Sequence, residues 1–135
     1  MARSLARDAA MKLIYAQMLG GDGGEETLTD LIAFKPTQDD RRYLEETVSS
    51  VLREKDRIDA LIEKYLVNWT LERLSRVDLS ILRLAVYELV FRKDIPAAVA
   101  INEAVELSHI YSTEESGSFI NGVLGNLNRS EKALV

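Results

Sequence analysis

The segment LSILRLAVYELVF, from Leu79 to Phe91, determines the architecture that we expect for this chain. Ten of its thirteen residues are apolar, and at about 100° per residue they surround the axis of a helix instead of forming one stripe. A helix that is apolar on all sides has to be covered by its neighbours, so the segment predicts a central helix in a bundle. Ser75 and Asp78 precede it with the three-residue spacing of a capping box.

The residues that follow predict two further helices. Ile95 and Pro96 form a turn, and Pro96 suits the first turn of the next helix. Residues 97–111 again place apolar groups over most of the circumference, so we expect a second buried helix there. A last helix runs from about Ser116 to Leu127. The narrow polar stripe left on the second buried helix consists of Asn102, Glu106 and His109.

The residues that come before the central helix repeat apolar groups every three or four positions, which also predicts helices. The first helix covers about 3–19 and ends at the glycines of residues 20–24. A short helix begins near Thr27 and closes at Pro36. The inward positions expected in the first helix are Leu5, Ala9, Leu13 and Ala16.

A second capping box, Thr37 with Asp40, opens a long helix whose inward positions are Leu44, Val48, Val51 and Leu52. A continuing or separate helix then carries Ile58, Leu61, Ile62 and Tyr65. Residues 68–70 form a joint between two halves. Because no segment alternates like a strand, we predict an all-α fold of about seven helices.

Length and composition describe one globular domain. The 135 residues are 47% apolar and 29% charged, enough to bury a core without a disulfide or a metal. There is no cysteine, which suits a reducing compartment. No run of about 18 apolar residues and no signal-peptide core is present, so we expect a soluble cytoplasmic protein.

The distribution of charge argues for a small anion contact. A formal net charge of -5 disfavours a protein that coats nucleic acid, since such affinity comes from Lys and Arg contacts to phosphates. Residues 1–12, however, are locally basic, and residues 22–30 are acidic. Arg3 and Arg7 stand one helical turn apart near the positive end of the first helix, where phosphate is attracted. Two solvated arginines on a helix end are an equally simple interpretation.

Catalytic arrangements are not evident in the sequence. Glu106 and His109 have the spacing of a di-iron motif, but such sites need a second motif, and His109 is the only histidine. Nothing near His109 resembles a nucleophile turn, and the glycines of residues 20–24 lack the Lys and Ser or Thr of a phosphate-binding loop. We therefore expect binding without catalysis, and neither a cofactor nor a metal.

Charged residues within the apolar helices need partners, because a lone charge is costly to desolvate. Arg83 and Glu88 belong to the central helix, and Glu103 belongs to the next one. We expect at least one of these carboxylates to pair with Arg83 between the two helices in a structural role.

Several motifs, spread over almost the whole chain, resemble the family of NusB transcription antitermination factors. The motifs are Ala6-Arg7 with Ala10 and Leu13-Ile14-Tyr15, Ile81-Leu82-Arg83-Leu84-Ala85 with Tyr87-Glu88-Leu89, Asp94-Ile95-Pro96, Ala100-Ile101-Asn102-Glu103-Ala104-Val105-Glu106-Leu107, and Phe119-Ile120-Asn121-Gly122-Val123-Leu124. The resemblance implies a non-enzymatic protein that binds single-stranded boxA RNA together with NusE, a small-subunit ribosomal protein. The pair helps RNA polymerase in the antitermination complex to read through terminators, notably in ribosomal RNA operons.

The resemblance also implies a fold and a set of site residues. The fold is a single RNA-binding domain over 1–135, made of two small packed helical bundles that cover about 1–66 and 67–135. The implied RNA contacts are Arg3, Arg7, Tyr111 and Phe119, with Phe119 equally acceptable as a core residue. The implied NusE contacts are Tyr15 and Asp78. Asn102, Glu103, Asn121 and Gly122 are implied to be structural.

Two alternatives belong to other classes of protein. The same fold occurs as an accessory RNA-binding domain of RNA methyltransferases, although 135 residues leave no room for a catalytic domain beside it. A small enzyme would need a cluster of acid, base or metal-binding residues, which the sequence does not offer.

Overall fold

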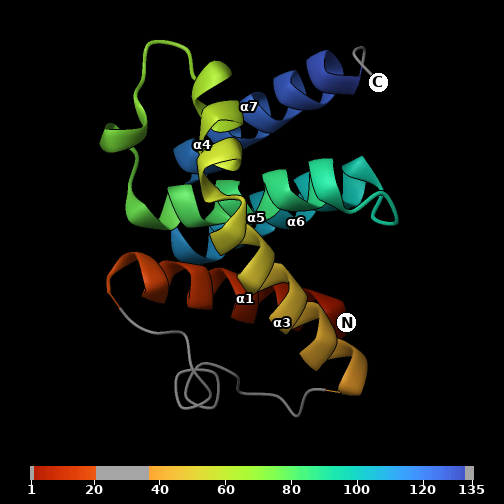
Figure 1. The fold of residues 1–135 in the computed structure, drawn as a ribbon. Coiled ribbons are helices and arrows are strands. Elements are labelled where there is room, and N and C mark those ends of the chain that lie inside the picture. Colours follow the sequence, from red (N-terminus) through yellow and green to blue (C-terminus); the bar gives the residue numbers. More distant parts are fainter. Residues whose placement is uncertain (1, 21–36, 133–135) are drawn as a thin grey trace.

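A computed structural model describes residues 2–20 and 37–132, with the side chains of Ala2, Arg3 and Lys132 left out. The described residues form six α-helices and one short 3-10 helix, η1, and no strand (Figure 1). The all-α prediction is confirmed. The short helix expected between Thr27 and Pro36 lies outside these residues. The bounds are α1 Ala2–Met18, α3 Gln38–Arg53, α4 Lys55–Lys64, η1 Leu71–Arg73, α5 Arg76–Phe91, α6 Ala97–Tyr111 and α7 Glu114–Lys132.

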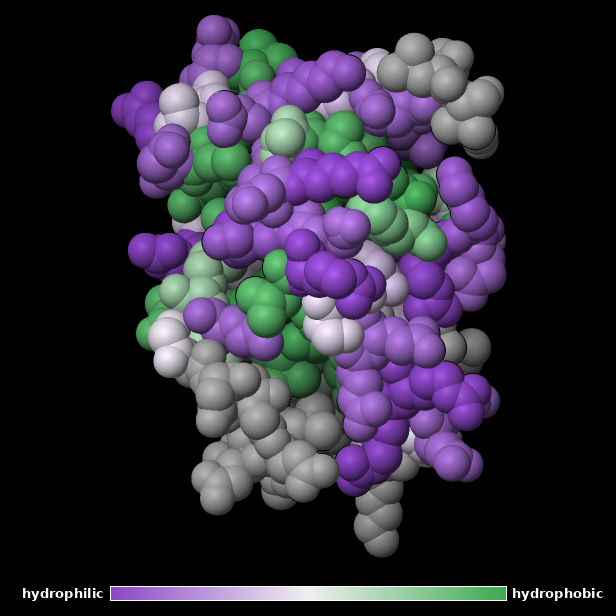
Figure 2. Space-filling view, viewed as in Figure 1, coloured by the Kyte–Doolittle hydropathy of each residue, from purple (hydrophilic) through white to green (hydrophobic). Residues whose placement is uncertain are grey.

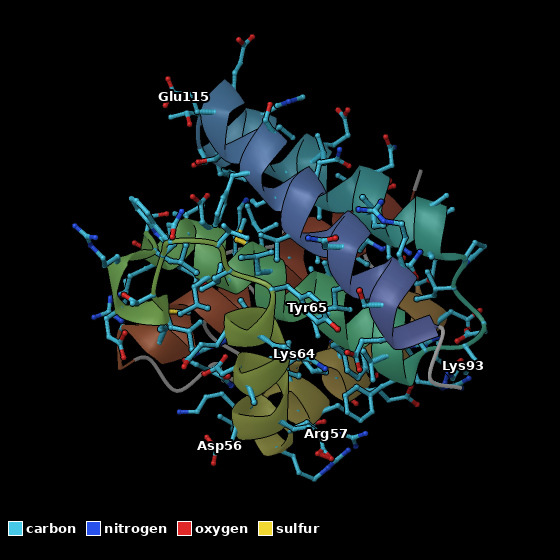
Figure 3. The ribbon with its side chains drawn as sticks, turned by 90° about the horizontal axis from the view of Figure 1, so that it is seen from above. Asp56, Arg57, Lys64, Tyr65, Lys93 and Glu115 are labelled. Atoms are coloured by element: carbon cyan, nitrogen blue, oxygen red, sulfur yellow. The ribbon has the colours of Figure 1, made fainter. Side chains whose placement is uncertain are left out.

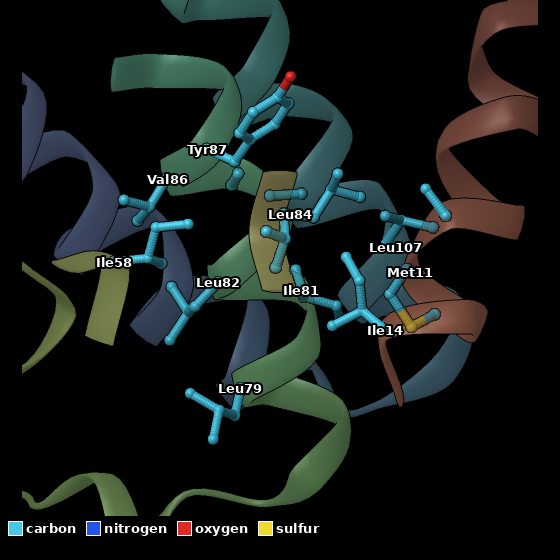
Figure 4. Packing of buried hydrophobic residues seen from close by; sticks show 14 of the residues in the cluster. Met11, Ile14, Ile58, Leu79, Ile81, Leu82, Leu84, Val86, Tyr87 and Leu107 are labelled. Atoms are coloured by element: carbon cyan, nitrogen blue, oxygen red, sulfur yellow. The ribbon is translucent and has the colours of Figure 1, made fainter. Parts of the chain in front are cut away.

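Helix α5 lies at the centre of the bundle, as predicted. It contacts each of the other five described α-helices, with α1 below it and α7 above it in Figure 1. Ile81, Leu82 and Val86 are fully buried. In Figure 4, side chains from α1 and α6 meet those of α5, and Ile58 of α4 lies beside Leu82 and Val86. Since α5 joins elements from both ends of the chain, the core extends across the predicted halves.

Helix α6 is less buried than its sequence predicted. Its bounds match the expected 97–111, but only Ala100, Ala104, Leu107 and Ser108 are buried. Val99 is 40% exposed and Ile110 is 64% exposed. The reason is that α6 packs against α5, α7 and α1 with one side only. The expectation of a second fully covered helix is therefore wrong.

The capping box predicted at the start of α3 is confirmed, whereas the one predicted at the start of α5 is present only in half, because the Asp78 carboxylate accepts from Ser116 instead of from the Ser75 amide. Thr37 and Asp40 form the reciprocal pair of hydrogen bonds of a capping box at the start of α3. The Ser75 hydroxyl accepts from the amide of Asp78 and so caps α5. Helices α3 and α4 are separate, with Glu54 between them. At the predicted joint, Asn68 has a φ of 57°, a left-handed conformation that asparagine tolerates better than most residues.

Two inward positions and both ends of the last helix differ from the prediction. Leu5 and Leu52 were expected in the core but are 49% and 56% exposed. Helix α7 begins at Glu114 instead of Ser116 and continues to Lys132. It starts early because the Thr113 hydroxyl accepts from the amide of Ser116 and caps the first turn.

The ends of α4 and α7 are joined by polar contacts on the surface. The Tyr65 hydroxyl and the Lys64 ammonium both donate to Glu131, and these bonds hold the pKa of the Glu131 carboxyl below its usual value. Figure 3 labels Lys64 and Tyr65 at the end of α4. The face formed by α3 and α4 is mostly hydrophilic, with apolar areas showing between the polar side chains (Figure 2). None of the described helices is long and apolar enough to cross a membrane.

We predict that Ile81→Ala lowers the free energy of unfolding by about 2 to 5 kcal/mol, because Ile81 is fully buried in α5 and its loss leaves a cavity. The matched control is Ile110→Ala on exposed α6, which should change it by less than about 0.5 kcal/mol. Urea unfolding followed by circular dichroism measures both. Equal losses in the two variants would contradict the central position of α5.

Candidate nucleic-acid interface

Polar side chains from α1 and α6 meet in a row on the surface. Ser4, Asp8 and Lys12 are spaced four residues apart and therefore share one face of α1. The Ser4 hydroxyl donates to Glu103 at 2.8 Å, and the Tyr111 hydroxyl donates to Asp8 at 2.6 Å. The Lys12 ammonium lies 2.9 Å from Asp8. We call these five residues the polar seam.

The outer end of the polar seam combines a cation, a carboxylate and an aromatic ring. The Lys12 ammonium lies 5.2 Å from the centroid of the Tyr111 ring. The pKa of Lys12 is raised, mainly by a hydrogen bond with the Tyr111 hydroxyl. Burial lowers this pKa, and the hydrogen bond and negative charge of Asp8 raise it further. Burial raises the pKa of Tyr111, and so does the bond to Asp8, while Lys12 lowers it. The Tyr111 side chain thus stays neutral and Lys12 stays charged over the physiological range.

Arg7 lies beneath the polar seam and not on the surface. It is only 4% exposed, and its Nε lies 3.0 Å from each carboxylate oxygen of Glu88 on α5. Its Nη1 lies 3.6 Å from Glu103, and the Tyr43 hydroxyl donates to Glu88 at 2.6 Å. The expectation that Arg7 presents a free guanidinium to phosphate is wrong for this structure, because the interior carboxylate holds it.

The expected partner of Arg83 is also wrong. Arg83 makes two parallel bonds to Asp59 of α4, at 2.8 and 2.9 Å, and its side chain is 12% exposed. Glu88 is five positions further along α5, which places it on a different side of the helix, toward α1 and α3. The need for a partner was predicted correctly, but the pairs are Arg83 with Asp59 and Arg7 with Glu88.

The other residues implied by the resemblance lie in different surroundings. Arg3 belongs to the first turn of α1, and its side chain is outside the described part. Tyr111 is 37% exposed. Phe119 is partly buried and packs against the core, so one part of its ring has a structural role. Of the implied RNA contacts whose side chains are described, Tyr111 belongs to the polar seam and is exposed, while Arg7 reaches the seam from beneath through Glu103.

The two residues implied to contact NusE lie on α1 and α5. Tyr15 is half-buried on α1. Asp78, in the first turn of α5, is 8% exposed, and its Oδ2 accepts from the Ser116 hydroxyl of α7 at 2.9 Å. Its Oδ1 is buried and has no hydrogen-bond partner. Asp78 thus ties α5 to α7 and keeps one acceptor unused.

Sequence reasoning did not assign a role to Lys12 and Asp8. Their four-residue spacing on α1 is visible in the sequence and is enough to predict the ion pair. Their contact with Tyr111 is not visible, because Tyr111 stands 103 positions after Asp8. Glu106 and His109 are both exposed on α6. In the described ranges no three His, Asp or Glu side chains are grouped so that they can hold a metal ion.

The sequence matches the NusB family over residues 4–129. It is 48% identical, over 128 residues, to the transcription antitermination protein NusB of Acetivibrio thermocellus, covering 94% of this chain and 88% of the relative. It is 46% identical, over 130 residues, to the protein of the same name from Clostridium botulinum strain Alaska E43, covering 94% of this chain and 98% of the relative.

Solved structures resemble the fold over nearly its whole length. T. maritima NusB superposes with a TM-score of 0.85 at 34% identity, covering 98% of this chain and 97% of the other. A chain from the crystal structure of the antitermination factors NusB and NusE in complex with dsRNA gives a TM-score of 0.83 at 31% identity, covering 96% and 97%.

We predict that Glu88→Gln lowers the free energy of unfolding by about 3 kcal/mol, because it leaves the buried Arg7 guanidinium without its main counter-charge while keeping the shape of the side chain. Glu45→Gln on the exposed side of α3 is the matched control and should change it by no more than about 0.5 kcal/mol. Chemical denaturation measures both. A Glu88 variant as stable as the control would show that the pair is dispensable.

We also predict that Asp8→Asn lowers the pKa of Tyr111 part of the way to the ordinary value of 10.0, because burial, the largest cause of the raised pKa, remains. Carbon-13 NMR of tyrosine Cζ measures the pKa of Tyr111 in both proteins. An unchanged pKa in the variant would show that the negative charge of Asp8 does not contribute to the raised pKa of Tyr111.

The raised pKa also predicts how stability depends on pH. Since it favours the neutral phenol in the folded chain, the stability due to Tyr111 is complete below pH 10.0 and is lost as the pH rises through the folded-state pKa.

Proposed function

Because the chain belongs to the NusB family, we propose that it is a transcription antitermination factor that binds boxA RNA together with NusE. In this role it helps RNA polymerase to read through terminators, notably in ribosomal RNA operons. It acts by binding and not by catalysis, in the bacterial cytoplasm where transcripts are made.

One observation carries this proposal. The chain superposes over 96% of its length on a protein solved together with NusE and dsRNA. The curated relatives support the same role, since those named above are antitermination proteins matched over 88% and 98% of their own lengths. They favour a free-standing factor over the accessory domain of an RNA methyltransferase.

We propose that RNA is bound at the start of α1 and at the polar seam. Arg3 provides a cation for phosphate near the positive end of the α1 dipole. Tyr111 provides an exposed ring on which an unpaired base can stack, and Phe119 the exposed part of a second ring. Such a contact uses few phosphates, which suits a chain with a net charge of -5.

We assign Arg7 an indirect role. Its guanidinium is held by Glu88 and Glu103, so it fixes the first turns of α1 against α5 and α6. Arg3, four residues earlier, takes its place relative to the seam from that attachment. Arg7 is therefore a positioning residue and not a phosphate contact.

We place the NusE contact at Tyr15 and Asp78. Tyr15 is half-buried and Asp78 is 8% exposed, and the Oδ1 of Asp78 can accept a hydrogen bond from a partner group only after a local rearrangement exposes it. If RNA and NusE both favour the same arrangement of the chain, each strengthens the binding of the other by the same factor.

The test is a titration of single-stranded boxA RNA, with scrambled and duplex RNA as competitors, with and without the cognate NusE and at several salt concentrations. We predict a preference for boxA that NusE strengthens. Arg3→Ala should make the slope of log affinity against log salt shallower by roughly 0.7, the value for neutralising one phosphate of a single strand.

Arg42→Ala, on the exposed side of α3, removes the same charge elsewhere and should leave the slope unchanged. A complex with NusE that binds boxA no better than scrambled RNA refutes the proposed function. Equal slopes for the Arg3 variant and wild type remove only Arg3 from the site.

A further inference from the structure

The outer end of the polar seam has the parts of a nucleotide-binding site. The Tyr111 ring is exposed, and the Lys12 ammonium lies 5.2 Å from its centroid. A base that stacks on a tyrosine ring has its phosphate within reach of a neighbouring cation, and proteins that bind single strands combine these two contacts. The side chain of Lys12 is 32% exposed, so its ammonium is accessible from solvent.

In the free protein Asp8 contacts both the Lys12 ammonium and the Tyr111 hydroxyl. Its Oδ1 lies 2.9 Å from the Lys12 ammonium, and its Oδ2 accepts the Tyr111 hydroxyl at 2.6 Å. Asp8 thus takes the position toward Lys12 that a phosphate oxygen would take. The side chain of Asp8 is 22% exposed, so the pair is neither buried nor isolated, and a competing anion can reach Lys12.

Resting on the function proposed above, we propose that Lys12 and Tyr111 form a subsite for one nucleotide of the RNA, with Asp8 as a built-in competitor. Lys12 binds the phosphate, and the Tyr111 ring stacks on the base. Asp8 holds Lys12 until RNA displaces it, which weakens binding and selects for ligands that supply both a phosphate and a base.

The strength of the ion pair sets the size of the expected effect. An exposed ion pair contributes so little free energy that forming or breaking it changes an equilibrium constant, here that of RNA binding, by at most about fivefold. Breaking the pair in the free protein should therefore strengthen RNA binding by about two- to fivefold. The slope of log affinity against log salt should also become steeper by up to roughly 0.7 when the pair is broken. In wild type, Lys12 can bind a phosphate only by leaving the Asp8 carboxylate unpaired, and without that carboxylate the full charge of Lys12 neutralises the phosphate.

The test is a double-mutant cycle on boxA RNA binding in the presence of NusE. Asp8→Asn keeps an oxygen acceptor for the Tyr111 hydroxyl but cannot form the ion pair. We expect this variant to bind more tightly than wild type, Lys12→Met to bind more weakly, and Asp8→Asn to have little effect once Lys12 is Met. Asp39→Asn on α3, whose carboxylate is 83% exposed, is the control for a general change in charge.

The ring is tested separately. Tyr111→Phe keeps a surface for stacking and leaves the ion pair of Lys12 with Asp8 in place, so it should bind RNA about as tightly as wild type. Tyr111→Leu should weaken binding roughly tenfold, because a leucine side chain offers no ring for the base to stack on. Since Asp8, Lys12 and Tyr111 lie at the surface, each variant should unfold at nearly the wild-type urea concentration.

The possible results separate this inference from the proposed function. If wild type with NusE shows no preference for boxA, both are refuted. Suppose that wild type prefers boxA. The competitor role of Asp8 is wrong if Asp8→Asn strengthens RNA binding as much in the Lys12→Met background as in wild type. It is also wrong if Asp8→Asn strengthens RNA binding no more than Asp39→Asn does. If Tyr111→Leu binds like Tyr111→Phe, the ring does not stack on a base.

Discussion

The buried guanidinium of Arg7 is the group to which the positions of the surrounding helices are tied. An unpaired cation in the interior is very costly, and the groups that satisfy Arg7 come from different helices, Glu88 from α5 and Glu103 from α6. Tyr43 of α3 completes the set by donating to Glu88. Apolar burial supplies most of the stability of such a bundle, but it is non-directional. The ion pair is directional, so it specifies where α1 lies against the centre, since a slide or rotation of α1 would leave a buried charge unpaired.

This attachment places the surface that we propose for RNA. Ser4 lies almost one turn before Arg7 and Asp8 immediately after it, so fixing Arg7 also fixes the α1 side of the polar seam. The other side is set by α6, which packs on α5 with its small residues Ala100 and Ala104 and leaves Tyr111 exposed. The interior charge and the surface groups are therefore parts of one arrangement, in which the buried residues position the exposed ones.

Features that depend on neighbouring residues could be predicted from the sequence, and features that depend on how helices dock could not. The central place of α5, the bounds of α6 and the cap at Thr37 follow from periodicity and hydrogen-bonding chemistry within a few positions. The exposure of Ile110 and the burial of Arg7 depend on which side of each helix meets another. The sequence showed that Arg83 and Glu88 need partners, but Asp59 and Arg7 stand 24 and 81 positions away from them. Asp8 and Lys12 are four positions apart, so their ion pair could be predicted from the sequence. The contact of Tyr111 with Asp8 depends on how α6 docks against α1, so this part of the site could not.

If the proposed function holds, the same arrangement also explains how a chain with a net charge of -5 would bind RNA and why a partner would matter. Arg7 is used in the interior and Lys12 is held by Asp8, so neither of these two described cations is free for phosphate at this surface. A site of this kind gains only weakly from phosphate attraction, and more of its affinity has to come from stacking and from a second protein. Under the proposed function, tight binding then requires RNA and NusE together, because each contributes contacts that the other cannot make. Under the same proposal, binding to unrelated RNA is expected to stay weak, as required of a factor that selects one element among many transcripts.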